Sequence, residues 1–364
     1  MYPNKAQIKM IWKHIGTCRF LYNLSLEEKI RAFQSENKSL TMFDLNNRIP
    51  ELKKQYEWMS ETNSQSLQAV NRNVETAFKN FFRKKADFPE FKSKKNPVQS
   101  FQVPQHYEVK LTENKVKLPK LGTVKTVISK KFTGTLKTAT VSATSTGKYY
   151  ISVLVDDGLK EPEPAPFNST NTVGIDVGLT SFLVTSEGLK EENPRYLKNS
   201  LERLKHLQRS VSKKVNGSNN RRKAVHKVAI LHERISNQRS DFLHKHSYKL
   251  VSENQAIAVE TLNISGMLKN KNLARSISDV GWSELFRQLE YKCKMYGKTL
   301  LKIGQFEPSS KLCSVCGTIN RDLTIQDRNW TCSDCGAHHD RDINAAINIK
   351  KMALQAQNLL PNSG

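Results

Sequence analysis

Acidic residues are scarce in this sequence, and long apolar runs are missing. The 364 residues include 34 Asp and Glu against 58 Lys and Arg, which gives a formal net charge of +24. This excess favours a polyanionic partner, with nucleic acid the leading candidate and an anionic membrane surface the weaker one. No apolar run approaches the roughly 20 residues of a membrane-spanning helix, and the opening MYPNKAQIKM lacks the apolar segment of a secretory signal. We therefore expect no membrane partner and a reducing compartment that contains nucleic acid.

Cysteines are also few, and their spacing argues against a disulfide framework. Four of the six cysteines follow the pattern C-x2-C-x15-C-x2-C, namely Cys313, Cys316, Cys332 and Cys335. Two such pairs can bring four thiolates to one tetrahedral zinc ion, and because four thiolates leave no open coordination position, the predicted zinc is structural. Cys18 and Cys293 stand alone and are expected to pack as small apolar side chains.

The N-terminal part of the chain has the hydrophobic period of helices. From Lys5 to about Lys84 apolar residues recur at helical spacing. The first stripe consists of Ile8, Ile11, Trp12 and Ile15. A second helix is predicted over residues 64–83, where the polar Gln68 and Arg72 belong either to a solvated face or to a nucleic-acid contact.

The composition changes after the basic, proline-broken stretch RKKADFPEFKSKKNP. Residues 135–144 and 149–155 are rich in Thr, Val, Ile and Tyr on either side of a turn-like Ser-Thr-Gly, which predicts a β-hairpin. With VKLTENKVKLPKLG upstream, we expect a small β-sheet or barrel. The segment EPEPAPFNSTN is the best linker. We therefore predict a helical domain over 1–95, a β-barrel over 96–165 and a further domain over 170–364.

The last of these domains alternates strand and helix patterns. NTVGIDVGLTSFLVTSEG predicts two strands around a bend, and residues 195–252 predict a basic helical hairpin whose narrow apolar stripe lies over another surface. AIAVE at 256–260 is a buried-strand pattern, 282–296 a helix, 299–304 another strand, and the chain closes on a helix. This order predicts an α/β fold.

Three acidic residues lie where packing gives no reason for a charge. Asp176 sits in the apolar strand VGIDVG, Glu260 ends AIAVE, and Asp342 lies where the last helix begins. Buried carboxylates need a cation or hydrogen-bond donors. If the strands are neighbours and the helix crosses their ends, the three acids converge, which suits two divalent ions that cleave a phosphodiester. Taken singly, the aspartates could equally be a turn former and a helix-start acid.

The sequence resembles TnpB, the OrfB-type protein of bacterial insertion sequences, which is similar to the miniature type V CRISPR nucleases. The matching segments, in family order, are YPNKAQ, CRFLYN, ETAFKNFFR, FPEFKSKK, KLPKLGTVK, GIDVGLTSF, RQLEYK, PSSKLCSVCG and RNWTCSDCGAHHDRDINAAINI. Members of that family usually begin with a short strand ahead of YPNKAQ, so we expect one strand fewer in the β-domain of this chain.

This resemblance implies an RNA-guided DNA endonuclease that cuts double-stranded target DNA beside a short motif. An RNase H-like (RuvC) domain would hold Asp176, Glu260 and Asp342 around two Mg²⁺ ions, with the zinc ribbon, residues 308–338, inserted before the last acid. The N-terminal helical bundle and the small β-barrel would serve as recognition and wedge domains. The guide RNA would come from the transposon end, and base pairing would supply specificity in the bacterial cytoplasm, at the nucleoid.

Several further residues are candidates for nucleic-acid contact. Gln68, Asn46 and Gln102 match contact positions of the family, with Arg72 beside the first, and amide side chains can pair with adenine edges. Arg221, Arg222 and Lys223 in the basic hairpin either contact phosphates or form a solvated face. Arg328 either stabilises charge on the cleaved phosphate or braces the ribbon.

Three other functions are compatible with parts of this pattern. A guide-directed repressor would have lost triad acids, whereas all three are present. A transposase acting directly on single-stranded transposon ends would need a His-rich, Tyr-based site, which we do not find. A zinc-ribbon RNA-binding protein with an idle core would make no cut with any metal.

Overall fold

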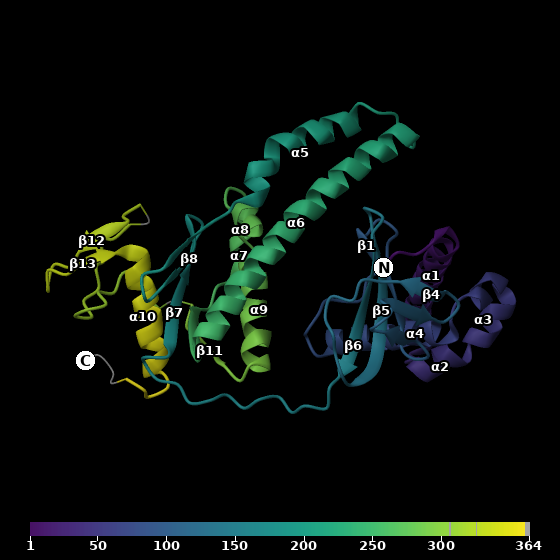
Figure 1. Ribbon diagram of the computed structural model, residues 1–364, viewed down its shortest axis with the longest axis horizontal. Coiled ribbons are helices and arrows are strands. Elements are labelled where there is room, and N and C mark those ends of the chain that lie inside the picture. The colour runs from purple at the N-terminus through teal and green to yellow at the C-terminus, as the bar shows by residue number, and fades with distance from the viewer. Residues whose placement is uncertain (306, 325, 361–364) are drawn as a thin grey trace. The chain divides into compact units, whose positions relative to one another are not determined.

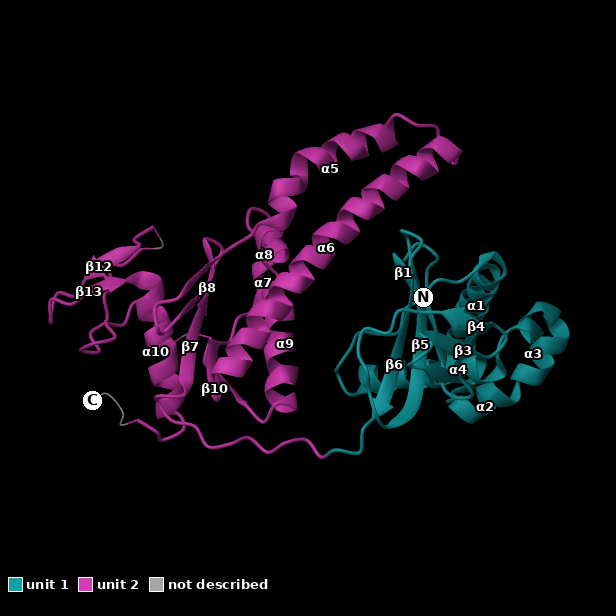
Figure 2. Cartoon of the chain, in the orientation of Figure 1, with its two compact units in different colours: residues 1–159 teal, residues 160–364 magenta. Residues whose placement is uncertain are grey.

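The computed structural model describes residues 1–305, 307–324 and 326–360. The chain divides into two compact units, residues 1–159 and 160–364 (Figure 2). Within the described ranges, no helix combines the length and the apolar character needed to cross a bilayer.

Unit 1 begins with helices and ends with strands (Figure 1). Its helices are α1 (Lys5–Glu36), α2 (Met42–Asn47), α3 (Ile49–Gln55), the 3-10 turn η1 (Glu57–Glu61) and α4 (Ser64–Phe82). Its strands are β1 (Val98–Val103), β2 (Glu108–Lys110), β3 (Lys115–Leu118), β4 (Gly122–Lys125), β5 (Thr135–Thr144) and β6 (Tyr149–Asp156). They form two antiparallel sheets with the orders β1-β5-β6 and β2-β3-β4.

One hydrophobic core joins the helices of unit 1 to its sheets. Ile11 and Ile15 of α1, Leu67 of α4 and Val141 of β5 are buried in it. The predicted helices and the hairpin of residues 135–155 are thus confirmed. The assignment of Trp12 to the buried stripe was wrong, because its side chain is 41% exposed and its indole Nε1 donates to the Tyr149 hydroxyl at 3.3 Å. An indole N–H needs a hydrogen-bond acceptor, and Trp12 finds one in the Tyr149 hydroxyl at the surface and not in the apolar core.

Unit 2 contains a mixed sheet and the helices that cover it (Figure 1). Its strands are β7 (Thr172–Val177), β8 (Ser181–Thr185), β9 (Lys190–Glu192), β10 (Ala256–Glu260), β11 (Thr299–Ile303), β12 (Asn329–Thr331) and β13 (His338–Asp340). Its helices are α5 (Tyr196–Ser212), α6 (Asn219–Glu253), α7 (Ile264–Met267), α8 (Ala274–Val280), α9 (Trp282–Met295) and α10 (Arg341–Gln355). The predicted strands at β7, β8, β10 and β11 and the last helix are confirmed, whereas β9 was not predicted.

The central sheet of unit 2 has the order β11-β10-β7-β8-β9. β10 runs parallel to both β7 and β11, while β8 is antiparallel to both of its neighbours, β7 and β9. Successive strand residues face opposite sides. Val173 and Ile257 belong to a core with α6 and α9, whereas Ala256 and Ala258 pack against Ile349 of α10. Helices therefore cover both faces of the sheet.

Gly174 allows α10 to approach β7 closely. A Cβ atom at this position would lie 2.1 Å from the Ala346 carbonyl oxygen and 2.8 Å from the Lys350 backbone nitrogen. Any side chain would therefore push the last helix away from the strand. This contact fixes the height of α10 above the sheet.

The basic hairpin of unit 2 consists of α5 and α6. Its apolar stripe packs the two helices against each other, with Leu204 of α5 buried against Leu231 and Ile235 of α6. The surface that Leu204 packs on is therefore the other helix of the hairpin, whereas Leu243 and Leu250 at the far end of α6 pack into the sheet core. The two stripes that face each other within the hairpin bury their own apolar side chains, whereas Val215, Val225 and Ile230 are exposed among the polar and basic residues of the hairpin surface.

Candidate active site and nucleic-acid surface

Asp176 and Glu260 lie at equivalent positions of two neighbouring parallel strands. The β7–β10 pairing ends with Ile175 opposite Val259, and the next residue on each strand is the acid. Gly174 and Asp176 share one face of β7, as Ala258 and Glu260 share one face of β10, because side chains alternate along a strand. This is the face that α10 covers, so both carboxylates lie beside that helix.

Asp342 enters this region from the first turn of α10. Asp340 caps the helix, and its Oδ1 accepts hydrogen bonds from the backbone N–H of Asp342 at 3.2 Å and of Ile343 at 3.1 Å. The other oxygen of Asp340 pairs with Lys190 Nζ of β9 at 2.5 Å. The cap and this ion pair hold the start of α10 at the sheet.

The charges of Asp342 and Glu260 act on the carboxyl group of Asp176. Burial raises the pKa of Asp176 to about 7, with further contributions from the negative charges of Asp342 and Glu260. Burial also raises the pKa of Glu260. A carboxylate that is buried beside two other carboxylates is stabilised when a cation binds and offsets their negative charges. The structure thus brings together the three acids that the sequence singled out.

This cluster has the donor chemistry of a divalent metal site. Carboxylate oxygens are ligands that Mg²⁺ prefers, and Mg²⁺ is bound through one or two carboxylates together with water and phosphate. Among the described residues, only the four cysteines form a group of potential ligands whose donor atoms all lie within 4.8 Å of one another. The carboxylates are more widely spaced than that, so they fit ions that also bind oxygens from water or substrate.

Cys313, Cys316, Cys332 and Cys335 converge as their spacing predicts. The sulfur atoms of Cys313 and Cys335 are 3.7 Å apart, and those of Cys316 and Cys332 are 3.6 Å apart. No disulfide links cysteines in the described ranges. Four thiols at these distances could bind a metal such as zinc. The strands β12 and β13 and the turns around the first cysteine pair form the surrounding ribbon.

Sequence analysis missed three residues that hold this ribbon, two of which connect it to α10. The Asn344 side chain donates to the Leu312 carbonyl oxygen at 2.7 Å and accepts from the backbone N–H of Ser314 at 2.9 Å. Asn348, one turn later, donates to the carbonyl oxygens of Ser309 and Leu312 at 2.8 and 2.6 Å.

His339 is the third of these residues. Its Nε2 lies 3.0 Å from the sulfur of Cys313, and its ring packs on Trp330 with centroids 4.6 Å apart. A buried polar side chain next to a ligand set commonly orients the ligands. Asn344 and Asn348 are four residues apart on the apolar side of a predicted helix, and this spacing could have identified them as buried polar contacts.

Arg328 lies next to the acid cluster. Its guanidinium Nη1 is 3.7 Å from Asp342 Oδ1, its Nη2 donates to the Thr180 hydroxyl at 3.4 Å, and the side chain is 51% exposed. Arg328 also accepts a hydrogen bond from the backbone N–H of Arg341 through its carbonyl oxygen. Arg328 thus links the ribbon to the start of α10, and its half-exposed guanidinium lies beside Asp342.

Four residues of unit 1 are predicted to contact nucleic acid, and they differ in whether their side chains are exposed or already hydrogen-bonded within the protein. Gln68 and Arg72 are exposed one turn apart on α4. Asn46 instead accepts from Asn71 Nδ2 at 2.9 Å, and Gln102 accepts from Asn73 Nδ2 at 3.3 Å. Gln68 and Arg72 therefore offer exposed surface groups, whereas Asn46 and Gln102 already hold the fold together.

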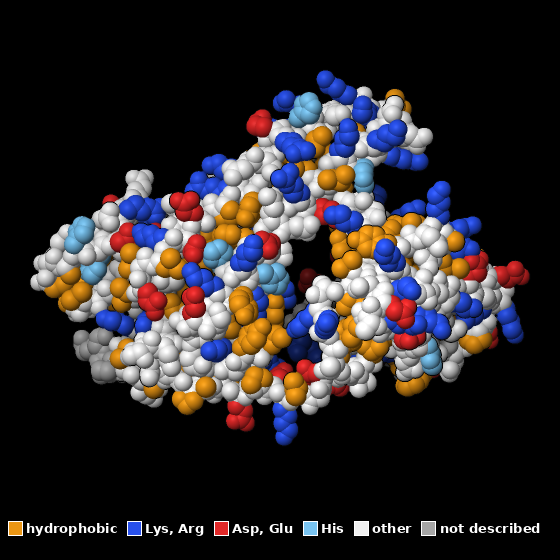
Figure 3. All heavy atoms as spheres, in the orientation of Figure 1, with side chains coloured by type: hydrophobic (Ala, Val, Ile, Leu, Met, Phe, Trp, Pro, Cys, Tyr) orange, Lys and Arg blue, Asp and Glu red, His pale blue; other side chains and the backbone are white. Residues whose placement is uncertain are grey.

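The α5–α6 hairpin is strongly basic, and Figure 3 shows Lys and Arg side chains gathered over it. Residues 195–252 contain 15 Lys and Arg and 3 Asp and Glu, which is half of the net charge of the chain. Arg222 and Lys223 are exposed, whereas Arg221 donates to the carbonyl oxygens of Val211 and Lys214 at 3.0 and 3.2 Å and so closes the turn. Such a surface suits phosphate contacts.

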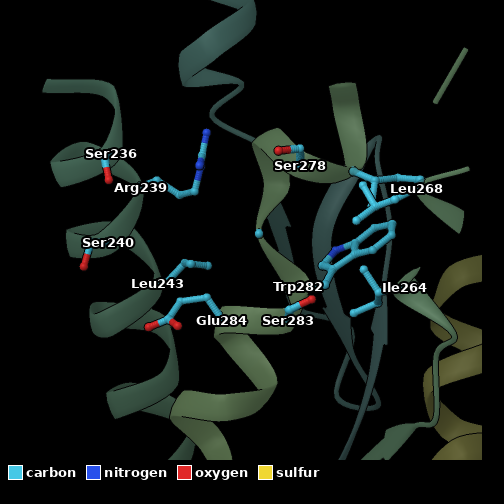
Figure 4. Close-up of a pocket in the computed structure, with 12 residues that line it drawn as sticks. Ser236, Arg239, Ser240, Leu243, Ile264, Leu268, Ser278, Trp282, Ser283 and Glu284 are labelled. Carbon is cyan, nitrogen blue, oxygen red and sulfur yellow. The ribbon is translucent and has the colours of Figure 1, made fainter. Parts of the chain in front are cut away.

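A cavity of about 380 Å³ lies elsewhere in unit 2, between α6 and the start of α9 (Figure 4). Its walls include Arg239, Leu243, Trp282 and Glu284, and none of the three clustered acids lines it. Arg239 pairs with Asp279 at 3.1 Å, and Glu284 with Arg287 at 2.7 Å. Both charges are thus already compensated by neighbouring side chains.

Three family models match this chain. The model described as "Probable transposase" (OrfB_IS605) covers residues 151–271, the "Cas12f1-like, TNB domain" model covers 282–349, and a "Helix-turn-helix domain" model (HTH_OrfB_IS605) covers 1–38. In the structure, the last of these ranges contains one continuous helix, α1.

Full-length relatives decide the family. A Streptomyces pristinaespiralis protein named "Putative RNA-guided DNA endonuclease" is 40% identical and covers 98% of this chain and 88% of the relative. "Putative RNA-guided DNA endonuclease InsQ" of Escherichia coli K12 is 32% identical, over 95% of this chain and 89% of the relative. Mimivirus "TnpB-like protein L79" is 27% identical over 51% of this chain. This chain belongs to the TnpB-like family.

Solved structures show the same fold for this TnpB-like chain. A Cas12f1 chain, from the cryo-EM structure of a Cas12f1-sgRNA-target DNA complex, superposes with a TM-score of 0.60. The match covers 94% of this chain and 82% of the Cas12f1 chain at 16% sequence identity. The chain therefore has the mixed α/β fold of Cas12f1.

Proposed function

We propose that this TnpB-like chain is an RNA-guided, metal-dependent DNA endonuclease that cuts double-stranded target DNA beside a short motif. The observation that carries this proposal is the convergence of Asp176, Glu260 and Asp342 in a chain related over its full length to proteins named as such endonucleases. The guide would come from the transposon end, and cutting an empty donor site would help the insertion sequence persist. The site of action would be the bacterial cytoplasm, at the nucleoid.

The sheet of unit 2 supports an RNase H-like (RuvC) assignment. Three antiparallel strands, β9, β8 and β7, continue into the parallel strands β10 and β11. The two strand acids lie near the C-terminal ends of the neighbouring strands β7 and β10, and the cysteine ribbon precedes the helix that carries the third acid. Residues 1–95 would then be the recognition domain and residues 96–165 the wedge domain.

Asp176, Glu260 and Asp342 would hold two Mg²⁺ ions. When bound, such ions activate a water molecule and stabilise the leaving oxygen of a phosphodiester. Asp176 must be ionised to act as a metal ligand. Because burial and the neighbouring acids raise its pKa to about 7, part of the Asp176 population is protonated near neutral pH and would lose this proton when Mg²⁺ binds. Arg328, beside Asp342, would bind a non-bridging oxygen of the phosphate.

The four cysteines would bind a structural Zn²⁺. This ion would fix the first knuckle, to which Asn344 and Asn348 tie α10, and so would keep Asp342 at the sheet. Hydrogen bonds to the segments that carry metal ligands orient those ligands and the helices beside them.

The basic hairpin and the exposed face of α4 would bind the nucleic acids. Sequence specificity would come from base pairing with the guide, while the protein holds the duplex through its backbone and reads the adjacent motif. Arg222 and Lys223 would contact phosphates, and Gln68 and Arg72 would lie at the motif. A repressor that binds without cutting is not favoured, because all three acids are present and converge.

A library experiment tests this function. The protein is purified with co-expressed transposon-end RNA and given Mg²⁺ and plasmids that carry the guide-matched target beside randomised bases. We expect one short motif to be depleted by the wild type and not by the Asp176→Ala protein. Target binding without depletion by the wild type would instead indicate a repressor.

A further inference from the structure

An aromatic pocket lies in unit 1, where the C-terminal part of α1 faces the end of α4. The cavity measures about 390 Å³ and has phenylalanine walls: Phe33 from α1, Phe78, Phe81 and Phe82 from α4, and Phe88 from the segment that follows. Lys79 lies at its rim. None of the residues given a role above lines this pocket.

These rings are more exposed than the core of unit 1 requires. Leu67, Val70 and Val74 already bury the apolar face of α4. Phe82, in contrast, is 74% exposed and Phe33 is 61% exposed. Leaving large apolar side chains in water forgoes the free energy of burying them, and a contiguous exposed patch commonly marks a binding site.

The rings are also ordered in a way that suits stacking. Phe78 and Phe82 lie nearly parallel, with an interplanar angle of 27° and centroids 6.3 Å apart. Phe88 meets both Phe78 and Phe81 edge-on, at 5.6 and 5.3 Å, and so holds them in place. A flat aromatic ligand placed against Phe82 would continue this stack.

The charge around the pocket identifies the partner. Residues 79–95 contain seven Lys and Arg against two Asp and Glu. The Lys79 side chain is 63% exposed and lies 3.6 Å from Glu75, which also lines the pocket, and Arg83, Lys84 and Lys85 follow directly after α4. Protein interfaces are depleted in lysine, whereas exposed aromatic rings beside cationic side chains are the usual site for unpaired nucleotides.

We propose that this pocket stacks on unpaired bases of the bound nucleic acid, with Phe82 as the platform and Lys79 and Arg83 at the phosphates. This inference rests on the proposed function, since it adds a site for single-stranded guide RNA or for a DNA strand displaced from its duplex. Both sources offer the same chemistry, a base with free faces next to a phosphate.

Fluorescence anisotropy of the RNA-free, full-length protein tests this proposal. The probes are a labelled short oligouridylate, a labelled oligothymidylate and a labelled DNA duplex. We expect Phe82→Ala to weaken binding of the single strands by roughly 5- to 150-fold, which is the usual value of one stacked base, and to leave duplex binding unchanged. A loss for the uridylate alone identifies the guide RNA, and a loss for the thymidylate alone identifies a DNA strand.

Two further variants keep the result interpretable. Phe82→Trp retains a stacking face, so it should bind like the wild type, and its added emission should be quenched by the single strands and not by the duplex. Phe43→Ala removes a ring that is 71% exposed on α2 outside the pocket, and it should bind all probes like the wild type.

Three outcomes would overturn the proposal. They are unchanged single-strand binding by Phe82→Ala, an equal loss for single strands and duplex, and a wild-type dimer in sedimentation that Phe82→Ala converts to a monomer. The last would make this surface a contact between copies. No probe carries a guide or a target, so a failure of guided cutting leaves this test intact.

Discussion

Replacing Asp176 by Asn should stabilise the magnesium-free protein. Burial and the neighbouring charges raise the pKa of this carboxyl from 3.8 to about 7 in the folded chain. At about 1.4 kcal/mol for each pKa unit, keeping Asp176 ionised in the fold costs up to about 4 kcal/mol. Asparagine has nearly the same shape and no charge, so it removes this cost.

The pH dependence has a defined sign. Below pH 3.8 both the folded and the unfolded chain keep the Asp176 proton, so this group does not affect stability. Between pH 3.8 and about 7 only the folded chain keeps it, and the free energy of unfolding of the wild type falls as the pH rises. The advantage of Asp176→Asn should therefore be about 4 kcal/mol at pH 8 and about 2 kcal/mol at pH 5.

Hydrogen exchange of the β7 and β10 amides measures this difference, because the slowest amides report the opening of unit 2. The buffer is freed of Mg²⁺ without a chelator, because a chelator would also remove a metal ion from the four cysteines. Asp279→Asn is the matched control, since its carboxylate accepts from the backbone N–H of Leu197 at 3.0 Å and from Arg239 Nη2 at 3.1 Å. Removing that charge should destabilise the chain by about 3 kcal/mol. Equal or lower stability of Asp176→Asn at pH 8, or a gain that does not shrink at pH 5, would refute this reasoning.

Three further changes test the packing and the ribbon. Gly174→Ala should lower the free energy of unfolding by about 3 kcal/mol or more, because its Cβ would lie 2.1 Å from the Ala346 carbonyl oxygen, and a loss below about 1 kcal/mol in thermal unfolding would contradict this. Cys313→Ser should release the zinc measured by elemental analysis and speed up hydrogen exchange within the ribbon, and a full zinc content would count against the four-thiolate site. Asn344→Leu should keep its zinc yet cut target DNA more slowly, because it unties α10 from Leu312; cutting at the wild-type rate would show that this tie does not position the helix.

Local patterns in the sequence predicted most elements of unit 2. The apolar runs at β7 and β10 and the spacing of the four cysteines each reflect constraints that act within a few residues. The convergence of the acids also followed, because a carboxylate buried in an apolar strand is costly unless a cation or a donor compensates its charge. Short elements with no hydrophobic period, such as β9 and α7, could not be found in this way.

Contacts between distant segments were not predictable. The sequence offered Asn46 as a base contact without showing that its Oδ1 accepts a hydrogen bond from Asn71 of α4, because only the fold brings the two together. Likewise, Trp12 has the spacing of a buried residue but finds its acceptor in Tyr149 at the surface. The hydrogen bonds from Asn344 to the first cysteine knuckle form only because the ribbon folds back onto α10, the helix that follows it, and the sequence does not show this folding.

The most direct test of the central claim compares cutting by four variants under single-turnover conditions with saturating guide and Mg²⁺. These are Asp176→Ala, Glu260→Ala, Asp342→Ala and the triple variant. If the carboxylates form one site, each single change should slow cutting by at least about three orders of magnitude, nearly as much as the triple change, while guide and target binding stay at wild-type strength. A single variant that cuts at close to the wild-type rate would show that its residue lies outside the active site and would contradict the assignment.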